Sequence, residues 1–401
     1  MKAIMYGGGN IGRGFIGMLL SKSGYEVTFI DVMDTVVDTL NREHTYPVRI
    51  IKGDTYEDID VENVSAINGK DVNAVAEAIA NADIMATAVG VNVLKFIVPN
   101  IVEGLRLRKE RNLPPFNIVI CENLMDANKV LEGMIKEKLS DDEQKWFDEN
   151  VGLVEASIGR MVPVQTEDMK DGNPMRICVE SYNYLPVDKD AFKGEIPQID
   201  NMIPFSPFDF YIKRKLYIHN MGHAICAYLG DLYKLEYIYE SIDKDDVYII
   251  VRGAMEESAR ALSKKYNVML EDIILHITDL LDRFTNAALR DTCKRVGGDP
   301  ARKLSPKDRL IGASKLAIEM GITPVYISIG VAAALFRYLS EAQDKTLTPE
   351  LILEEVCCLK TDEELSKLVV NMFALMKNGT SLKDIRRYAD KIVASKLINV
   401  I

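Results

Sequence analysis

KAIMYGGGNIGRGFIGMLLSKSGYEVTFID, residues 2–31, is the stretch that decides the fold. The apolar run over 2–6 predicts a strand, and apolar residues at helical spacing over 10–23 predict a helix. A second apolar run over 25–30 predicts another strand. Strand, helix and strand in this order, so close together, are typical of the first unit of a parallel sheet.

Three glycines, Gly7, Gly9 and Gly12, stand between the first strand and the helix in the spacing GxGxxG. The first permits a tight turn, the second lets the backbone approach a pyrophosphate, and the third lets the helix pack on the strand. The helix N-terminus then presents free N–H groups to phosphates. We therefore predict a dinucleotide site that also includes Asn10 and Ile11.

Asp31, at the end of the second strand, indicates which dinucleotide binds. A carboxylate at this position hydrogen-bonds the adenosine ribose and repels a 2′-phosphate. Residues 32–34 supply no arginine that would receive such a phosphate. The sequence thus predicts NAD rather than NADP. FAD uses a similar opening and remains the alternative for this motif taken alone.

Further strands, mostly separated by helical patterns, are predicted at 48–51, 83–90, 116–123 and 152–159. This alternation predicts a Rossmann-type doubly wound parallel sheet. Because ligands of such sheets bind beyond the carboxyl ends of the strands, we expect Val89, Gly90 and Asn123 to face the cofactor. Asn123 has an alternative interpretation as the N-terminal cap of the next helix.

The character of the chain changes near residue 206. Residues 166–207 are rich in loops and punctuated by prolines, and the sequence from 209 onward shows helical spacing. We predict an NAD-binding Rossmann-type domain over 1–205 and an all-helical substrate-binding domain over 206–401, with the substrate between them.

FDFYIKRKLYIHNMGHAICAYLG, residues 208–230, predicts a helix with Asp209 as its N-terminal cap and Gly230 as its end. On an ideal helix, at about 100° per residue, Asn220 lies about 140° and His223 about 80° from Lys215. An amine, an amide and an imidazole on one side of a helix are suited to removing a proton from an alcohol.

Two alternatives compete with this interpretation. A lone lysine on a helix is usually a solvated charge, and Asn220 with His223 would also suit a surface or core pair. His219 and His223 have the i, i+4 spacing of metal ligands, but the glutamate of the HExxH motif is absent. The sequence therefore predicts no metal.

One segment, 283–309, departs from the acidic average. It concentrates eight basic residues around a Gly-Gly-Asp-Pro turn: Arg283, Arg290, Lys294, Arg295, Arg302, Lys303, Lys307 and Arg309. Arginine forks match the oxygens of phosphate, so the segment suits an anionic substrate. A solvated basic face balanced by acidic neighbours is the alternative.

The composition narrows the class of partner. The net charge of −11 and the pI near 5.1 argue against a nucleic-acid or acidic-membrane partner. No apolar run approaches the roughly 18 residues that a membrane span needs. The first strand directly follows Met1, so we expect no signal peptide. Six scattered cysteines without a CxxC motif indicate reduced thiols, and we expect a cytoplasmic protein.

Several motifs together resemble a known family. They are GGGNIGRGFIG at the start, CEN at Asn123, EASIGRMVP at 155–163, the pattern Lys-x-x-x-x-Asn-x-x-His at Lys215, and RVGGDPARKLSPKDRLI at 295–311. This combination resembles the polyol-specific long-chain dehydrogenase/reductase family from the first residue to about Leu310. The resemblance implies an NAD-dependent enzyme that interconverts D-mannitol 1-phosphate and D-fructose 6-phosphate without a metal, as a monomer or homodimer.

The resemblance also implies roles for residues. Lys215 matches the general base, Asn220 and Asn123 match the residues that polarise the reacting oxygen, and His223 matches a residue that binds the substrate. Arg295 and Lys303 match basic positions that line the substrate site.

We add Arg302 as a phosphate ligand on charge alone. Paired glycines at 297 and 298 depart from the family pattern and leave the local loop shape open. A hexuronate reductase of the same family, acting on tagaturonate or fructuronate, and a non-catalytic NAD-sensing module remain alternatives.

Overall fold

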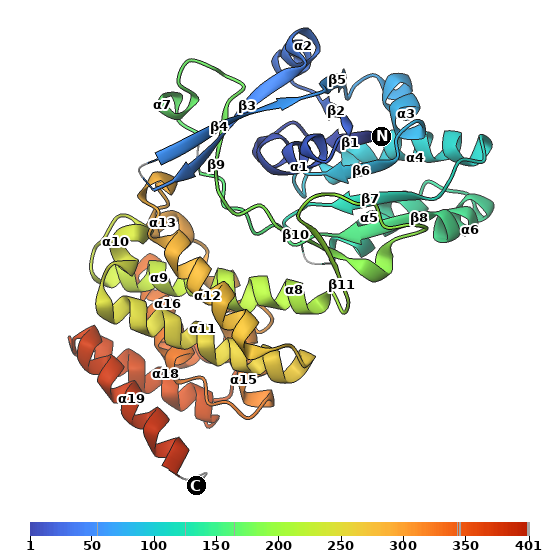
Figure 1. Ribbon diagram of the computed structural model, residues 1–401. Coiled ribbons are helices and arrows are strands. Elements are labelled where there is room, and N and C mark those ends of the chain that lie inside the picture. Colours follow the sequence, from blue (N-terminus) through green and yellow to red (C-terminus); the bar gives the residue numbers. More distant parts are fainter. Residues whose placement is uncertain (54, 125, 164, 343, 345, 399–401) are drawn as a thin grey trace. The chain divides into compact units, whose positions relative to one another are not determined.

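The computed structural model describes residues 1–398 except 54, 125, 164, 343 and 345, with side chains as far as 395. The chain divides into two compact units, Met1–Asp209 and a second that begins at Phe210 (Figure 1). The predicted boundary between 205 and 206 falls at the end of the last strand of the first unit. Each unit is described by itself below.

A six-stranded parallel sheet organises the first unit, in the order β5-β2-β1-β6-β7-β8. Its strands are β1 (Lys2–Tyr6), β2 (Glu26–Asp31), β5 (Val64–Asn68), β6 (Ile84–Thr87), β7 (Phe116–Ile120) and β8 (Val151–Glu155). The strand order reverses next to β1, as in dinucleotide-binding sheets. The predicted Rossmann-type fold class is confirmed.

The strand that pairs with β2 in the main sheet differs from the prediction. Residues 48–51 do form a strand, β3 (Thr45–Lys52), but it belongs to a separate three-stranded sheet with β4 (Thr55–Glu62) and β9 (Ile177–Glu180). The main sheet instead uses β5, which pairs in parallel with β2. A tight antiparallel hairpin between β3 and β4 accounts for the difference, because it satisfies the backbone of β3 locally.

Both faces of the main sheet are covered. Along β1, Ala3 and Met5 point into one core and Ile4 and Tyr6 into the other, as alternation on a strand requires. The first core is closed by η1 (Gly12–Gly17), α1 (Met18–Lys22), α2 (Asp34–Glu43) and the three-stranded sheet. The second is closed by α3 (Val72–Ala80), α4 (Leu94–Glu110), α5 (Ala127–Lys136) and α6 (Asp141–Asn150).

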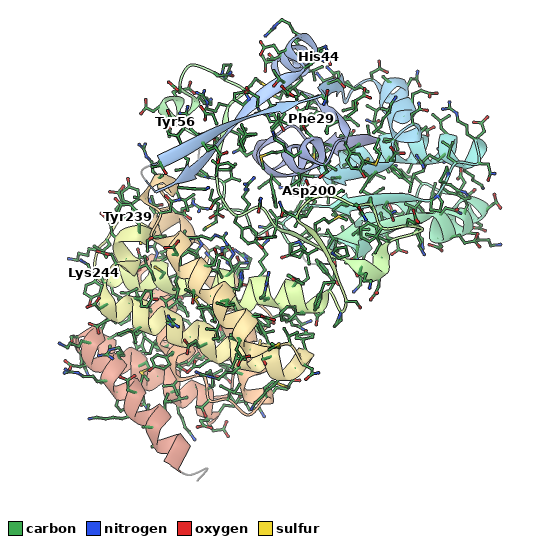
Figure 2. All side chains as sticks on the ribbon, viewed as in Figure 1. Phe29, His44, Tyr56, Asp200, Tyr239 and Lys244 are labelled. Carbon is green, nitrogen blue, oxygen red and sulfur yellow. The ribbon has the colours of Figure 1, made fainter. Side chains whose placement is uncertain are left out.

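An aromatic pair ties the two sheets of the first unit together. Phe29 of β2, labelled in Figure 2, packs edge-on against Tyr46 of β3 with ring centroids 5.7 Å apart. The loop-rich end of this unit contains α7 (Glu167–Lys170), β10 (Leu185–Asp188), η2 (Lys189–Ala191) and β11 (Met202–Phe205). Strands β10 and β11 pair in parallel.

The second unit is helical throughout its described residues, as predicted. Its first elements are α8 (Asp209–Arg214), η3 (Lys215–Asn220), α9 (Met221–Leu232), α10 (Ile238–Ile242), α11 (Asp245–Tyr266) and α12 (Leu270–Phe284). They are followed by η4 (Ala287–Leu289), α13 (Cys293–Val296), α14 (Pro300–Lys303), α15 (Ile311–Glu319), α16 (Val325–Glu341), α17 (Pro349–Glu355), α18 (Glu364–Lys377) and α19 (Leu382–Ile398).

Helices α9, α11 and α16 form the centre of the second unit (Figure 1). They pack on one another, and α9 buries nine of its residues. Packing in the core therefore positions α9, which carries part of the predicted catalytic motif. Over the described part of the chain, no helix combines the length and the apolar character that a membrane crossing demands.

Candidate active site

The glycine turn between β1 and η1 is built by contacts that exclude larger side chains. Gly7 has φ of +103°, and a Cβ there would lie 2.5 Å from the carbonyl oxygen of Ala88. A Cβ on Gly12 would lie 1.9 Å from the carbonyl oxygen of Gly7. Gly9 is exposed, and a Cβ there would meet nothing within 4 Å. Gly7 and Gly12 therefore fix the shape of the turn, and Gly9 leaves backbone open to a ligand.

The segment after the turn, η1, is a π-helix whose residues are all buried. A Cβ on Gly14 would lie 2.6 Å from Ile177 of β9, and one on Gly17 would lie 2.4 Å from the ring of Phe29. Glycine thus allows β9 and β2 to press directly on η1. Asn10, which is exposed, and Ile11, which is half-buried, immediately precede this segment.

Asp31 is held by the backbone beside the glycine turn. Its Oδ2 accepts from the Gly8 N–H at 2.7 Å, and its Oδ1 accepts from the Met33 N–H at 2.9 Å. Each carboxylate oxygen has two acceptor positions, so both retain one for a further hydroxyl donor. The carboxylate is therefore oriented and still has acceptor capacity for a ribose.

The loop after β6 is held by a residue that sequence reasoning missed. Glu122 is buried, and its two carboxylate oxygens accept from the N–H groups of Val89 at 2.9 Å and Gly90 at 2.8 Å. Gly90 has φ of +91°, a conformation that favours glycine. Glu122 is the acid of the CEN motif, directly after β7, and a charged residue at the end of a buried strand was the signal that pointed to it.

Asn123 follows Glu122 and is exposed. The alternative that it caps the next helix is wrong, because α5 begins at Ala127 and its N-cap position is Asp126. Asp126 has φ of +52° and forms no side-chain cap hydrogen bond. Asn123 therefore lies beyond the carboxyl end of β7 without a capping role.

The central helix differs from the prediction at both ends. Asp209 is the first residue of α8 rather than its cap. Gly230 lies inside α9, which continues to Leu232. A Cβ on Gly230 would lie 2.7 Å from the sulfur of Cys293 and 2.8 Å from the hydroxyl oxygen of Ser241. This glycine serves close packing between helices rather than helix termination.

The helix is also not α-helical where the chemistry was predicted. Lys215 and Asn220 are the first and last residues of the π-helical segment η3. A π-helical turn is closed by hydrogen bonds between residues five apart. The angle of about 140° assumes an ideal α-helix and does not apply to η3, whose wider turn brings residues five apart closer to the same side of the helix.

Lys215 is half-buried. Burial, together with the positive charge of Arg309, lowers the pKa of its amine to about 8. An amine with this pKa exchanges a proton near neutral pH, which an ordinary surface lysine does not. The interpretation of Lys215 as a solvated surface charge is therefore not supported.

His223 lies in α9, three residues after Asn220, and its ring is held on two sides. Nε2 is 3.2 Å from Oδ2 of Asp291, and the ring of Phe284 stacks on the imidazole with centroids 4.8 Å apart. Asp291 is the second residue that sequence reasoning missed. It belongs to the basic segment, where acids were treated only as neighbours that balance charge.

His219 faces the protein interior. Burial lowers the pKa of its imidazole well below the ordinary value, and the charge of Arg283 lowers it further. Its ring centroid lies 6.2 Å from that of His223. Within the described ranges, no three His, Cys, Asp or Glu side chains are grouped so that they could hold a metal ion.

The three predicted substrate-binding cations have different surroundings. Arg295 is exposed and forms an ion pair with Asp291. Arg302 is exposed and pairs with Asp299 at 2.7 Å and Asp308 at 3.0 Å.

Lys303, the third of these cations, is buried. Its amine donates to the carbonyl oxygens of Val296, at 2.8 Å, and Gly298. Burial and the charge of Arg309 lower its pKa to about 8. Lys303 therefore closes the Gly-Gly loop, whose shape the sequence left open.

The structure gathers the predicted residues into two groups. In the first unit, Gly7, Gly9, Asp31, Val89 and Gly90 converge at the carboxyl ends of β1, β2 and β6. In the second, Lys215, Asn220 and His223 follow one another along η3 and α9, and Asp291 joins His223 to Arg295.

Two family models match most of the chain. A mannitol dehydrogenase Rossmann domain matches residues 1–201, and a mannitol dehydrogenase C-terminal domain matches residues 208–393. Among relatives, a mannitol-1-phosphate 5-dehydrogenase of Caldanaerobacter subterraneus subsp. tengcongensis is 40% identical over 86% of this chain and 88% of its own. A protein of the same name from Thermoanaerobacter pseudethanolicus is 39% identical over the same shares.

Solved structures share the fold at low identity. A substrate-free D-sorbitol dehydrogenase matches with a TM-score of 0.81 and 14% identity, covering 96% of this chain and 94% of that one. Mannitol 2-dehydrogenase of Pseudomonas fluorescens, in a ternary complex with NAD and D-mannitol, matches with a TM-score of 0.72 and 15% identity, covering 98% and 94%. This chain belongs to the mannitol dehydrogenase family and is an oxidoreductase of the polyol dehydrogenase class.

Proposed function

We propose that this protein interconverts D-mannitol 1-phosphate and D-fructose 6-phosphate with NAD, and that Lys215 is its general acid and base. The observation that carries the proposal is the placement of Lys215, Asn220 and His223 along the consecutive segments η3 and α9. Burial there lowers the pKa of Lys215 to about 8, which suits a residue that exchanges a proton. Relatives named mannitol-1-phosphate 5-dehydrogenase at about 40% identity support the choice of substrate.

The residues of the first unit fit NAD. The glycine turn brings bare backbone to the surface at Gly9, next to the N-terminus of η1, where a pyrophosphate would bind. Asp31 would accept from the ribose hydroxyls, and its charge disfavours a 2′-phosphate. When bound, NAD supplies the hydride acceptor and NADH the hydride donor for the carbon that reacts.

Lys215 would take the hydroxyl proton during oxidation. With a pKa of about 8, roughly one tenth of the amine is neutral at pH 7 and able to accept a proton. In reduction the charged form, which dominates at that pH, would donate the proton to the carbonyl oxygen. One residue near its midpoint of titration therefore serves both directions.

Asn220 and Asn123 would polarise the reacting oxygen. An amide N–H that donates to an oxygen developing negative charge is typically worth about 3 kcal/mol in the transition state. Asn220 and Lys215 are the two ends of the single π-helical segment η3, which supports a shared role at one reacting oxygen. Asn123 would contribute from the end of β7.

The phosphate group would be held by guanidinium forks. Arg302 uses Nε and Nη1 for Asp299 and Asp308, and a guanidinium has five N–H donors, so donors remain for phosphate oxygens. Arg295 is likewise anchored at one edge and exposed. We assign these two residues to the phosphate. We infer that Lys303, whose amine binds two carbonyl oxygens, supports the loop beneath them.

Initial rates of NADH consumption test the proposal. The purified protein is compared with D-fructose 6-phosphate, unphosphorylated fructose, fructuronate and tagaturonate at equal concentration. We expect D-fructose 6-phosphate to give the highest kcat/KM. Preference for a hexuronate would assign the protein to the reductase alternative, and NADH binding without turnover of any substrate would assign it to the sensing module. A flavin absorbance of the purified protein would contradict NAD as the cofactor.

A further inference from the structure

Asp291 lies in the second unit and connects two residues of the proposed substrate site. Its Oδ2 is 3.2 Å from Nε2 of His223, and its Oδ1 accepts from Nε of Arg295 at 2.7 Å. Its side chain is only 12% exposed, whereas that of Arg295 is 60% exposed. One largely covered carboxylate thus contacts an imidazole and the Nε side of an exposed guanidinium.

The backbone around Asp291 is fixed. Its carbonyl oxygen accepts from the Ile238 N–H at 2.9 Å, and Thr292 forms an isolated bridge with Tyr237. Thr292 also caps α13 by accepting from the Arg295 N–H at 3.2 Å. The carboxylate is therefore placed by the fold and not by its side-chain partners alone.

Two neighbours orient the imidazole of His223: one stacks on its plane and the other contacts Nε2. Phe284 stacks on it at an interplanar angle of 17°, and Asp291 holds Nε2. In the described part of the chain, no other hydrogen bond involves this ring. Nδ1 therefore has no competing partner there.

The chemistry of Asp291 decides which nitrogen carries the proton. Burial alone would raise the pKa of its carboxyl, but hydrogen bonds from His223 and Arg295 outweigh burial and hold the pKa below the ordinary value. An ionised carboxylate only accepts hydrogen bonds. Nε2 must therefore bear the hydrogen, and in the neutral ring Nδ1 is an acceptor.

We propose that Asp291 is a positioning residue that holds His223 as the Nε2–H tautomer, so that Nδ1 accepts a hydrogen bond from a substrate hydroxyl. The inference rests on the proposed function, which identifies the molecule that carries this hydroxyl as an open-chain polyol phosphate. His223 thus binds a hydroxyl that donates. Donation to the reacting oxygen is left to Asn220 and Asn123.

Nitrogen NMR of the protein without substrate tests the tautomer directly. The chain has four histidines, so selective ¹⁵N-histidine labelling gives four imidazole patterns, and H223Q identifies that of His223. We expect a ring protonated at Nε2 only, and a mixture of tautomers in D291A. A ring that carries hydrogen on Nδ1, or on both nitrogens, at the pH of the assay overturns the proposal. Because no substrate is present, this result does not depend on the proposed function.

Kinetics in matched backgrounds separate positioning from general stability. We expect D291A to lower kcat/KM by about tenfold to a hundredfold, the range found for residues that orient ligating histidines. D291N, whose amide oxygen still accepts from Nε2–H, should recover part of the loss. D246N is the control, because Asp246 forms a similarly buried ion pair with Arg386 at 3.1 Å. We expect its kcat/KM to stay at the level of the unmodified protein.

Double variants test whether Asp291 acts through His223. In an H223A protein, D291A should not lower kcat/KM any further. In an R295A protein, D291A should still cause most of the loss in kcat/KM that it causes alone. An equal loss of kcat/KM with and without His223 overturns the proposal. If no polyol or sugar phosphate is turned over by the unmodified protein, the proposed function fails, and the NMR result still decides the tautomer.

Discussion

Two segments of the described chain are π-helical, and they coincide with the two motifs that suggested a function. They are built from opposite kinds of residue. The first, η1, contains three glycines and is completely buried. The second, η3, contains no glycine and presents Lys215 and Asn220 at its ends. π-Helical turns are rare and are frequently found at functional sites. Here η1 shapes the backbone after the glycine turn, and η3 sets the spacing between Lys215 and Asn220.

Removal of the amine from η3 should have the largest effect on catalysis. We expect K215A to lower kcat by several orders of magnitude, because the substitution removes the amine proposed to exchange the proton. NADH affinity and the melting temperature should stay nearly unchanged. Both are measured by NADH fluorescence titration and thermal unfolding. K213A, altered two residues earlier on the same helix, is the matched control and should retain turnover. Normal turnover in K215A would end the assignment.

Substitutions of Gly12, the first residue of η1, and of Gly9 just before it should affect cofactor binding rather than proton transfer. We expect G12A to abolish NADH binding and to destabilise the protein by about 1–3 kcal/mol, because its Cβ would overlap the carbonyl oxygen of Gly7. G9A is the matched comparison, since its Cβ meets nothing.

We expect G9A to keep its melting temperature and to weaken NADH binding by at least about tenfold, or 1.4 kcal/mol, through interference with the pyrophosphate. Unchanged NADH affinity in G9A would show that the cofactor does not approach this backbone.

The pH dependence should originate in η3 and not in η1. Oxidation needs neutral Lys215, so its kcat/KM should rise about tenfold per pH unit until pH reaches about 8. Reduction needs the charged amine and should fall above about pH 8. R309Q removes a positive charge that lowers this pKa, so both profiles should move to higher pH.

R260Q is the control for the pH experiment, because Arg260 pairs with Glu256 on the exposed face of α11. Its profiles should match those of the unmodified protein. A midpoint that R309Q leaves in place would show that another group titrates.

The smallest effect should come from the loop beside the glycine turn. Glu122 accepts hydrogen bonds from two backbone N–H groups. E122Q keeps the shape of the side chain, but its amide NH2 would face one of these donors, so that hydrogen bond is lost. We expect a loss of about 1–3 kcal/mol in unfolding free energy and a severalfold rise in KM for NADH. E149Q, on the outer end of α6, is a matched surface change and should do neither.

The sequence predicted well whatever depends on local periodicity. The strand predicted at 2–6 coincides with β1, and the helical spacing predicted from 209 onward includes α12, because both elements carry a regular pattern of buried apolar residues. It failed where partners distant in the chain decide. Residues 64–68 were missed as a strand because their pattern is weak without β2 beside them. Gly230 was taken as a helix end because its neighbours Cys293 and Ser241 are invisible locally.

The candidate site shows the same limit. The motifs predicted candidate site residues such as Lys215 and His223, but they did not predict Glu122, which holds the loop at Val89 and Gly90, or Asp291, which contacts His223. The segment from Lys215 to Asn220 was predicted as α-helical but is π-helical, because residue spacing does not reveal a π-helical turn. Residue type predicts chemistry, whereas orientation depends on contacts that only the folded chain supplies.

The close packing of β9 against η1 has a consequence for how the chain folds. Gly14 packs on Ile177, and Arg13 donates to the Met175 carbonyl oxygen at 2.7 Å, although more than 160 positions separate them. Residues 2–31 are therefore synthesised long before their packing partners in and near β9. During synthesis it must wait for the ribosome to deliver β9, and a nascent fragment that stops earlier would expose the apolar surface of η1. Such long-range closure slows folding and makes early chaperone protection valuable.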